Sequence, residues 1–293
     1  PCEILILPRV SSRPLLASLA LLGSAAMITA GPLNPPAGPV ASTYKTLSEV
    51  EPRIAINATN TPGDATSVFK ITQPGSYYLT ADPGLIPGGK HGILIAASNV
   101  TVDLNGFQLW SLGNIINALD GVSASAGTDH ITVSNGITRN MNGDGIDLSL
   151  ASECRVEDIH ATNNNGNGIS LGANSIIWGC VARQNGGGGV QCATNCVLDR
   201  CAAAGNAFIG IAGGAGSPLS RCSASGNSAG FSASPGSTLS DCSASGNLSR
   251  GFNLGSGCTA AHCAANSNAG DGFTAASGCS FLSCTAYFNA ANG

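Results

Sequence analysis

The sequence predicts an all-β solenoid in which short strands wind into stacked coils of about 21 residues each. Three observations predict it: a repeat of nearly constant length from residue 91 onward, pairs of small or apolar residues spaced two apart, and columns of one residue type. A period of two is typical of a strand, because successive side chains point to opposite faces. A repeat of this length indicates units that bury their inner faces only by stacking.

The repeat is clearest in a cysteine column, which two residues later is followed by a column of alanine. The cysteines are Cys180, Cys201, Cys222, Cys242, Cys263 and Cys284, spaced 21, 21, 20, 21 and 21 residues apart. The inward pairs of one coil are Ile169 and Leu171, Ser175 and Ile177, and Cys180 and Ala182. Three pairs separated by turns predict three short parallel strands per coil and a triangular cross-section.

A column of asparagines lies five residues after the cysteine column. It contains Asn164, Asn185, Asn206, Asn227, Asn247, Asn268 and Asn289. Asparagine tolerates the left-handed conformation that a tight corner needs, and stacked amides can hydrogen-bond up a ladder. We therefore expect an asparagine ladder at one corner, with a structural role.

The composition narrows the class of protein. Only 10% of the 293 residues are charged, the net charge is −4, and glycine supplies 40 residues. Globular domains carry about 25% charged residues, so a tightly stacked repeat fits this composition better. The net negative charge does not indicate the basic surface that nucleic-acid binding requires. No apolar run after residue 30 is long enough to span a membrane, so no membrane span is expected in the mature chain.

The N-terminal residues predict export. Arg9 and Arg13 precede an apolar stretch that ends in small residues at Ala30. This pattern is typical of a cleavable signal peptide over residues 1–30, the alternative being a membrane anchor. The mature protein is then secreted or held at the cell surface, where disulfides are permitted.

The remaining chain divides into three parts. Residues 31–43 are rich in proline and glycine and predict a linker. Residues 44–90, with a short helix over 44–52, predict an N-terminal cap over the first coil, since an open solenoid end exposes core and strand edges. Residues 91–293 form the coils, and no closing element follows them, so we expect the sequence to be truncated at its C-terminus.

Several segments resemble a known superfamily. Gly168-Ile169-Ser170-Leu171, residues 198–203 and residues 100–107 are similar to the repeat of pectate-lyase-like proteins. The resemblance covers residues 31–293 and extends to secreted bacterial β-helix proteins of unassigned function. It implies a right-handed single-stranded parallel β-helix. It does not fix an activity, because the superfamily includes lyases, hydrolases, epimerases, adhesins and non-catalytic proteins.

The cysteines match no standard zinc-ligand spacing. Since their columns point inward, we interpret them as buried small hydrophobic residues. Disulfides and a metal site remain alternatives, although stacked thiols on parallel strands have poor disulfide geometry.

The residues before the cysteine column form a solvent-facing corner, where charges gather. The candidate catalytic residues are Asp158, Asp199, Arg200 and Arg221, and the candidate carbohydrate-binding residues are Trp178, Glu157, His160 and Asp241. The resemblance implies acidic ligands for Ca²⁺, should the chain be a lyase, and a basic residue to abstract a proton; otherwise no cofactor is expected. The alternative is a set of solvated salt bridges between coils.

A second carboxyl pair, Asp144 and Asp147, precedes and enters one early strand. Glycoside hydrolysis needs two carboxyl groups held several ångströms apart, so a hydrolase site is conceivable there. A polar turn followed by a solvated strand is the alternative. His91 and His130 precede early strands and are expected to be turn residues.

Two functions therefore remain open. The first is binding or modification of extracellular polysaccharide, as a polysaccharide lyase or glycoside hydrolase if the chain is an enzyme. A groove that brings Asp158, Trp178, Asp199, Arg200 and Arg221 within reach of one another would favour it. The second is a non-catalytic surface or adhesive repeat protein, and charges that are spread out and paired would favour that.

Overall fold

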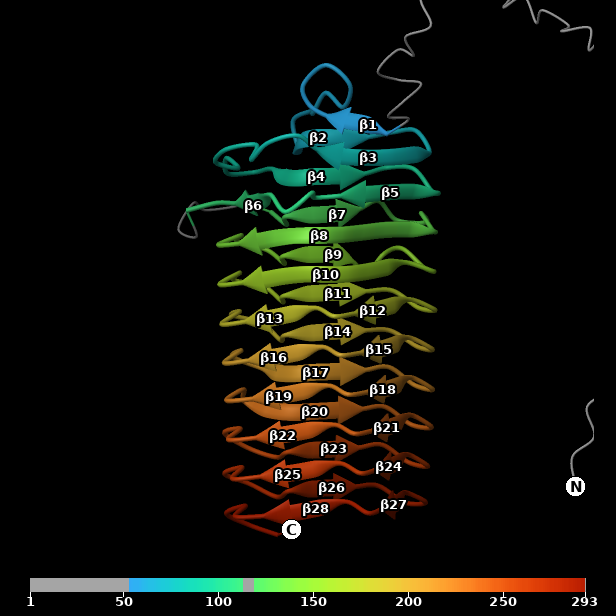
Figure 1. Cartoon of the computed structure of the whole chain (residues 1–293), viewed down its shortest axis with the longest axis vertical. Helices are drawn as coiled ribbons and strands as arrows, with labels where there is room; N and C mark the ends of the chain where they lie inside the picture. The colour runs from blue at the N-terminus through green and yellow to red at the C-terminus, as the bar shows by residue number, and fades with distance from the viewer. Residues whose placement is uncertain (1–52, 113–118, 293) are drawn as a thin grey trace, which may run out of the picture. The chain divides into compact units, whose positions relative to one another are not determined.

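The computed structural model describes residues 53–112 and 119–292, and these residues form a right-handed parallel β-helix (Figure 1). Every strand ladder among them is parallel, and none of the described residues lies in a helix. The predicted signal peptide, the linker and the helix expected at 44–52 lie outside the described residues.

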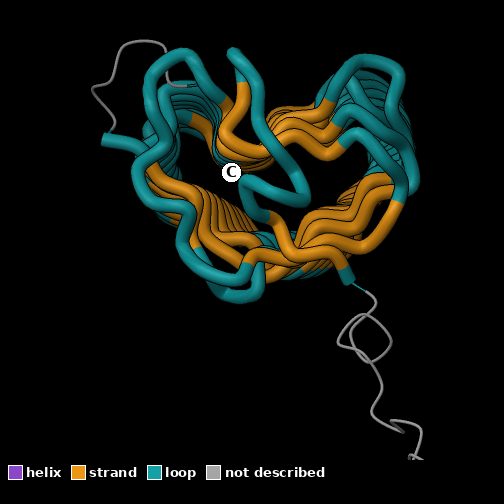
Figure 2. Tube along the Cα trace, turned by 90° about the horizontal axis from the view of Figure 1, so that it is seen from above, coloured by secondary structure: helices purple, strands orange, loops and turns teal. Residues whose placement is uncertain are grey.

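Most coils contribute three short strands, as predicted, and the stack has three faces (Figure 2). The first face is a 10-stranded sheet, and the second and third faces together form an 18-stranded sheet. They are counted as one because β8 (Ile131–Arg139) and β10 (Arg155–Thr162) run without a break through the corner between them.

The strands of the first face are β2 (Ser67–Ile71), β4 (His91–Ile95), β7 (Val122–Ala124), β9 (Ile146–Leu148), β11 (Ile169–Leu171), β14 (Val190–Cys192), β17 (Ile209–Gly213), β20 (Ala229–Ala233), β23 (Phe252–Leu254) and β26 (Phe273–Ala275). The second face adds β1 (Ile54–Ile56), β3 (Gly75–Leu79), β5 (Val100–Asp103), β12 (Ile176–Trp178), β15 (Val197–Asp199), β18 (Pro218–Ser220), β21 (Thr238–Ser240), β24 (Thr259–Ala261) and β27 (Ser280–Leu282). The third face adds β6 (Gln108–Trp110), β13 (Val181–Arg183), β16 (Ala202–Ala204), β19 (Ser223–Ser225), β22 (Ser243–Ser245), β25 (Ala264–Asn266) and β28 (Thr285–Tyr287).

The coils begin earlier than the sequence pattern suggests. Strands β1, β2 and β3 lie within residues assigned to the cap, yet β1 pairs with β3, β3 with β5, and β2 with β4. The described part of the predicted cap, residues 53–90, is therefore already coil. The repeat was hidden there because proline–glycine turns and longer loops interrupt its period.

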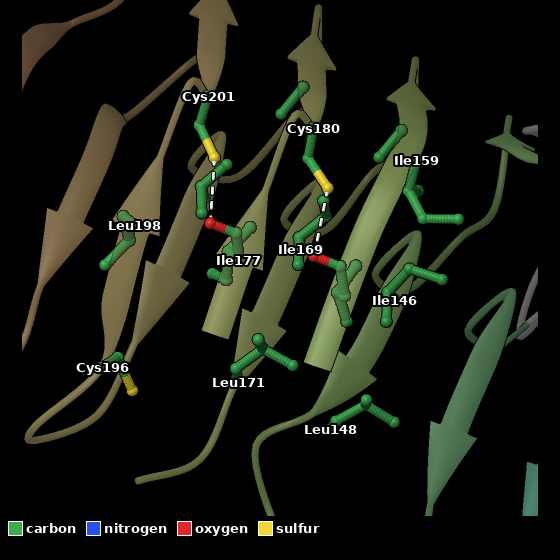
Figure 3. Packing of buried hydrophobic residues seen from close by; sticks show 14 of the residues in the cluster. Ile146, Leu148, Ile159, Ile169, Leu171, Ile177, Cys180, Cys196, Leu198 and Cys201 are labelled. Atoms are coloured by element: carbon green, nitrogen blue, oxygen red, sulfur yellow. Dashed lines mark hydrogen bonds between the residues drawn. The ribbon is translucent and has the colours of Figure 1, made fainter. Parts of the chain in front are cut away.

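The predicted inward columns form the core (Figure 3). Ile169, Ile177 and Cys180 are fully buried, and the Cys201 thiol donates to the backbone oxygen of Ile177 over 3.8 Å. All eleven cysteines of the described residues are free thiols. Burial raises the pKa of Cys180 to about 12, which keeps it neutral. The stacked thiols thus fill space as small apolar groups, as predicted.

The asparagine ladder is present, and its amides hydrogen-bond from coil to coil. Asn206 Nδ2 donates to Asn227 Oδ1 over 2.8 Å and to the backbone oxygen of Ala182 over 3.1 Å. Asn206 Oδ1 in turn accepts from the backbone N–H of Asn185 at 3.0 Å. The ladder side chains from Asn164 to Asn268 are therefore buried and hydrogen-bonded.

The left-handed conformation expected of these asparagines belongs to the residue before each of them. Gln184, Gly205 and Gly226 have φ angles of 52°, 65° and 63°. The preceding residue makes the sharp turn, and the asparagine side chain is thereby free to point inward toward the backbone carbonyls of the coil below. The left-handed residue therefore lies one position earlier than predicted, whereas the predicted hydrogen bonds between stacked amides are confirmed.

Replacing one ladder residue should destabilise the coils. We expect Asn206→Ala to lower the free energy of unfolding by about 1–3 kcal/mol, because buried polar partners lose their hydrogen bonds. Urea unfolding measures this, and Asn253→Ala, which removes an exposed asparagine from the outer side of β23, is the matched control. Equal effects of the two substitutions would contradict a structural role for the ladder.

Candidate functional site

The predicted charged edge lies on the second face, where strand register sets its order. Glu157 is aligned with Trp178, and Trp178 with Asp199, on three successive coils. Arg200 and Arg221 follow at the corner, each in the left-handed conformation, with φ near 54° and 52°. The structure therefore brings Trp178, Asp199 and both arginines together, as expected.

These charges are paired with one another. Arg221 Nε and Nη2 lie 2.9 and 2.5 Å from the two carboxylate oxygens of Asp199, and Ser220 Oγ donates to Asp199 over 2.8 Å. The Arg221 guanidinium holds the pKa of Asp199 below its usual value. Arg200 lies 5.7 Å from the centre of the Trp178 ring. Since donors and acceptors satisfy each other, the edge behaves as salt bridges between coils.

The remaining predicted residues lie apart from this pair. Glu157 accepts from Arg155 at 2.7 Å, and Asp241 is 3.8 Å from His262. Asp158 and Asp241 each lie two coils from Arg200, which is ~10 Å at the spacing of neighbouring strands. Asp158 and His160 instead line a separate hollow of about 210 Å³ beside Asn135. The edge thus forms no single constellation of the five residues.

A different set of acidic residues gathers on the first face, around a hollow of about 360 Å³ that we call the carboxylate hollow. Its lining residues are Asp144, Asp147, Ser149, Asn167, Ser170, Leu171, Gln191, Cys192 and Ala193. Asp147, Ser170 and Gln191 are aligned outward on the neighbouring strands β9, β11 and β14. This volume is within the ~300–1,000 Å³ typical of ligand sites.

The corner before the first face positions Asp144. In the early coils, the side chain at this corner accepts a hydrogen bond from the backbone N–H of the equivalent residue in the next coil. Asp120 Oδ1 accepts from the N–H of Asp144 at 2.7 Å, and Asp144 Oδ1 accepts from the N–H of Asn167 at 2.6 Å. Glycine follows each of them because the next coil lies too close for a Cβ; at Gly145 it would lie 2.6 Å from a backbone oxygen. Asp144 is thus held by main-chain contacts on two coils.

The electrostatics of the hollow set Asp144 apart. Burial raises its pKa, and the nearby charges of Asp120 and Asp147 raise it further, against the hydrogen bonds from Ser170 and Asn167. Ser170 Oγ lies 2.6 Å from Asp144 Oδ2. Asp147 accepts from the backbone and side chain of Ser149. A carboxyl group with a raised pKa and a second carboxyl group in the same hollow are the pair that acid–base chemistry needs.

Sequence reasoning found part of this site. It named Asp144 and Asp147, but it missed Asp120, Asn167 and Gln191. The signal that could have found Asp120 and Asn167 is their position before the glycine that opens each coil.

The two histidines expected at turns lie beside carboxylates. His91 Nδ1 is 3.1 Å from Asp120 Oδ2, so His91 extends the acidic corner toward the N-terminus. His130, which is left-handed with φ of 52°, lies 2.9 Å from Glu153 and 3.2 Å from Asp129 at another corner.

Within residues 53–112 and 119–292, no group of three or more histidine, cysteine, aspartate or glutamate side chains is arranged to hold a metal ion. This part of the chain also contains no helix with the length and apolar character needed to cross a membrane.

A family model described as "right handed beta helix region" matches residues 85–218. No curated protein matches the sequence. Among solved structures, the chain is similar to the A-module of the mannuronan C-5 epimerase AlgE6 of Azotobacter vinelandii, with 11% identity, a TM-score of 0.44, and coverage of 73% of this chain and 91% of that chain. For the pectate lyase Pel9A these values are 18%, 0.46, 75% and 68%, and for an alginate lyase of Paenibacillus sp. str. FPU-7 they are 11%, 0.39, 78% and 88%.

Stability should depend on pH through Asp144. Its folded pKa lies above the unfolded value of about 3.9, so its ionisation costs stability as pH rises from about 4 through the raised pKa. We expect Asp144→Asn to gain stability relative to the unmodified chain between about pH 4 and about pH 8. Urea unfolding at both pH values measures the difference, and a constant difference would contradict a raised pKa.

Asp199 should show the opposite sign. Its folded pKa is lowered by Arg221, so the pair stabilises the fold above the unfolded pKa, and this contribution is lost as pH falls. We expect Asp199→Asn to cost at most about 1 kcal/mol near neutral pH, since the pair is at the surface, and less in acid. The same urea titrations measure it, and a cost that grows in acid would be inconsistent with the ion pair.

Proposed function

We propose that this right-handed parallel β-helix binds an extracellular polysaccharide along its first face and hydrolyses it in the carboxylate hollow. One observation carries the proposal: Asp144 and Asp147 share a solvent-accessible hollow, and burial raises the pKa of Asp144. The extracellular setting is proposed from the export signal that the sequence predicts in residues 1–30.

In the proposed reaction the two carboxyl groups have different roles. Asp144, whose proton is retained to higher pH, donates a proton to the oxygen of the leaving sugar. Asp147, three residues further along the chain in β9, is the second carboxyl group, which activates water or attacks the sugar carbon. Ser170 and Asn167 hold Asp144 in place through hydrogen bonds of 2.6 Å each. This division of roles follows from the raised pKa of Asp144, which suits the group that donates the proton.

An extended polymer fits the first face better than a compact ligand. The outward column that passes through the hollow is Ser123, Asp147, Ser170, Gln191, Ala212, Ser232, Asn253 and Thr274. Nearly all of these side chains can hydrogen-bond to hydroxyl groups. Because the strands recur every ~4.8 Å along the axis, a chain of sugars lying along the axis would meet a polar side chain at most of the coils.

The Ca²⁺ that a lyase would use has no proposed role here. Ca²⁺ needs six to eight oxygen ligands, and within residues 53–112 and 119–292 no acidic group of three or more is arranged around a common ion position. The proposal therefore assigns the chemistry to the carboxyl groups themselves.

The second function, a non-catalytic surface or adhesive repeat, is favoured by one observation. The charges of the predicted edge are paired, as in the bidentate contact of Arg221 with Asp199. That face would then be a solvated scaffold. The two functions differ in turnover, which an assay can measure directly.

The proposal predicts hydrolysis that depends on the hollow. On a panel of neutral and acidic polysaccharides, we expect new reducing ends and no unsaturated products. Asp144→Asn and Asp147→Asn should each lower the rate of hydrolysis by about 10²–10⁴-fold. Urea unfolding of both variants checks that they are folded. Asp199→Asn and Arg221→Ala, which alter the other face, should keep full activity as matched controls.

Three outcomes would count against it. Activity that survives in both hollow variants would remove these carboxyl groups from the mechanism. Unsaturated products would indicate elimination. Binding without turnover on any substrate would favour the non-catalytic repeat.

A further inference from the structure

We infer that the third face carries a binding site for an acidic glycan, that is, a sugar polymer with carboxylate or sulfate groups. The site, which we call the cationic strip, consists of Arg139, His160, Thr162 and Arg183 on the successive coils of β8, β10 and β13. The carboxylate hollow is on the first face, so the two sites are separate. The inference does not require hydrolysis.

Strand register lines up the strip along the solenoid axis. Thr162 is aligned with Arg139 of one neighbouring coil and with Arg183 of the other. The residue before each of them is buried, so these three side chains point outward. The two arginines are therefore ~10 Å apart along the axis, with a hydroxyl group between them. Cations placed along the axis suit a linear polyanion that lies along it.

Neutral side chains hold the Arg139 guanidinium in place. Arg139 Nε donates to Gln108 Oε1 over 2.8 Å, and the guanidinium carbon lies 5.3 Å from the centre of the Trp110 ring. Gln108 Nε2 in turn donates to Asp82 Oδ2 over 3.1 Å, so an amide rather than a carboxylate contacts Arg139. The guanidinium is thus oriented before binding while its terminal N–H groups remain available to an anion, which reduces the entropy lost on binding.

The positive charges of the strip are not neutralised within the fold. Among the residues that the structure describes, neither Arg139 nor Arg183 forms an ion pair with a carboxylate. Arg221 on the second face differs, because Asp199 binds it through both carboxylate oxygens. Since Arg183 is also exposed, the charges of the third face are open to an anion from solution.

Two shallow hollows adjoin the arginines and share His160. The first, of about 260 Å³, is lined by His160, Ala161, Thr162, Val181 and Arg183. The second, of about 210 Å³, also contains Asp158. His160 and Asp158 supply a donor and an acceptor for sugar hydroxyl groups, and the half-buried Val181 offers an apolar surface to a sugar ring. The surroundings of the cations therefore suit a glycan.

The strip is confined to the early coils, and its charge density fits a glycan better than a nucleic acid. In register beyond Arg183 the same outward column continues as Ala204, Ser225 and Ser245, which are short and neutral. A nucleic-acid strand carries a phosphate about every 3.4 Å, far more closely than two arginines ~10 Å apart can match. A sugar polymer with more widely spaced anionic groups places fewer unpaired charges on this face.

The test measures dissociation constants of the full chain by affinity electrophoresis. The probes are polygalacturonate, which carries carboxylates, and dextran sulfate, which carries sulfate esters, with methyl-esterified polygalacturonate and dextran as their neutral counterparts. We expect tighter binding to an acidic polymer than to its neutral counterpart, and weaker binding as salt screens the charges. The acidic polymer that binds identifies the anionic group. Asp144→Asn should bind as the unmodified chain does, because the readout is independent of hydrolysis.

Single variants assign the binding to the strip. Arg139→Ala and Arg183→Ala should each raise the dissociation constant for the acidic polymer about 10-fold, because each removes a charge-assisted contact. Arg221→Ala, the same substitution at an exposed arginine of the second face, is the matched control and should leave the dissociation constant unchanged. Urea unfolding of the three variants checks that they are folded.

Three results would overturn the inference. The acidic polymers could bind no more tightly than their neutral counterparts. Folded Arg139→Ala and Arg183→Ala could bind as tightly as Arg221→Ala, which would place the binding elsewhere on the protein. Single-stranded DNA could bind as tightly as the acidic glycans, which would indicate a site for polyanions in general.

Discussion

The in-register pairing of parallel strands is the constraint on which the rest of this structure depends. It places each residue ~4.8 Å from its equivalent on the next coil, so a side chain must be compatible with a copy of itself. Inside, asparagine meets this condition by acting as donor to one neighbour and acceptor to the other, as Asn206 does between Asn185 and Asn227. Phe231 and Phe252 meet it by stacking at 4.8 Å. Uniform columns follow directly from this repetition.

The same constraint works against charges on the outside, where like groups would repel each other at that distance. The chain has two solutions. At the edge, Asp199 is followed one coil later by Arg221, which forms a bidentate pair with it. At the acidic corner, Asp120 and Asp144 lie on successive coils, and Asp120 accepts the backbone N–H of Asp144. In the second solution no side-chain cation of the hollow lining faces the acidic groups. Burial raises the pKa of Asp144, and the charges of Asp120 and Asp147 raise it further.

The sequence predicted the structure best where the repeat has a constant length. The core columns from Cys180 onward repeat every 20 or 21 residues. Their register was predicted correctly, and so was their burial as far as Cys263 and Ala265. Asp120 and Asn167 were missed because the early coils are longer: 24 residues separate Asp120 from Asp144, and 23 separate Asp144 from Asn167. A fixed period cannot align them. The predicted edge was located correctly, but sequence gives no side-chain directions, so the pairing of Asp199 with Arg221 could not be distinguished from an open site.

Irregularity and chemistry therefore coincide in this fold. The later coils carry short hydroxyls and alanines outward, as Ser223 and Ser243 do on the third face, and their columns change little from coil to coil. The coils containing β9, β11 and β14 combine longer corners with carboxyl groups, amides and the Cys192 thiol around one hollow. Coils with the same sequence pattern present the same outward surface, so a distinct site requires coils that differ from the repeat in sequence or length. Such departures are tolerated at corners, because the hydrogen-bonded strands on either side of a corner keep the register while the corner itself changes length.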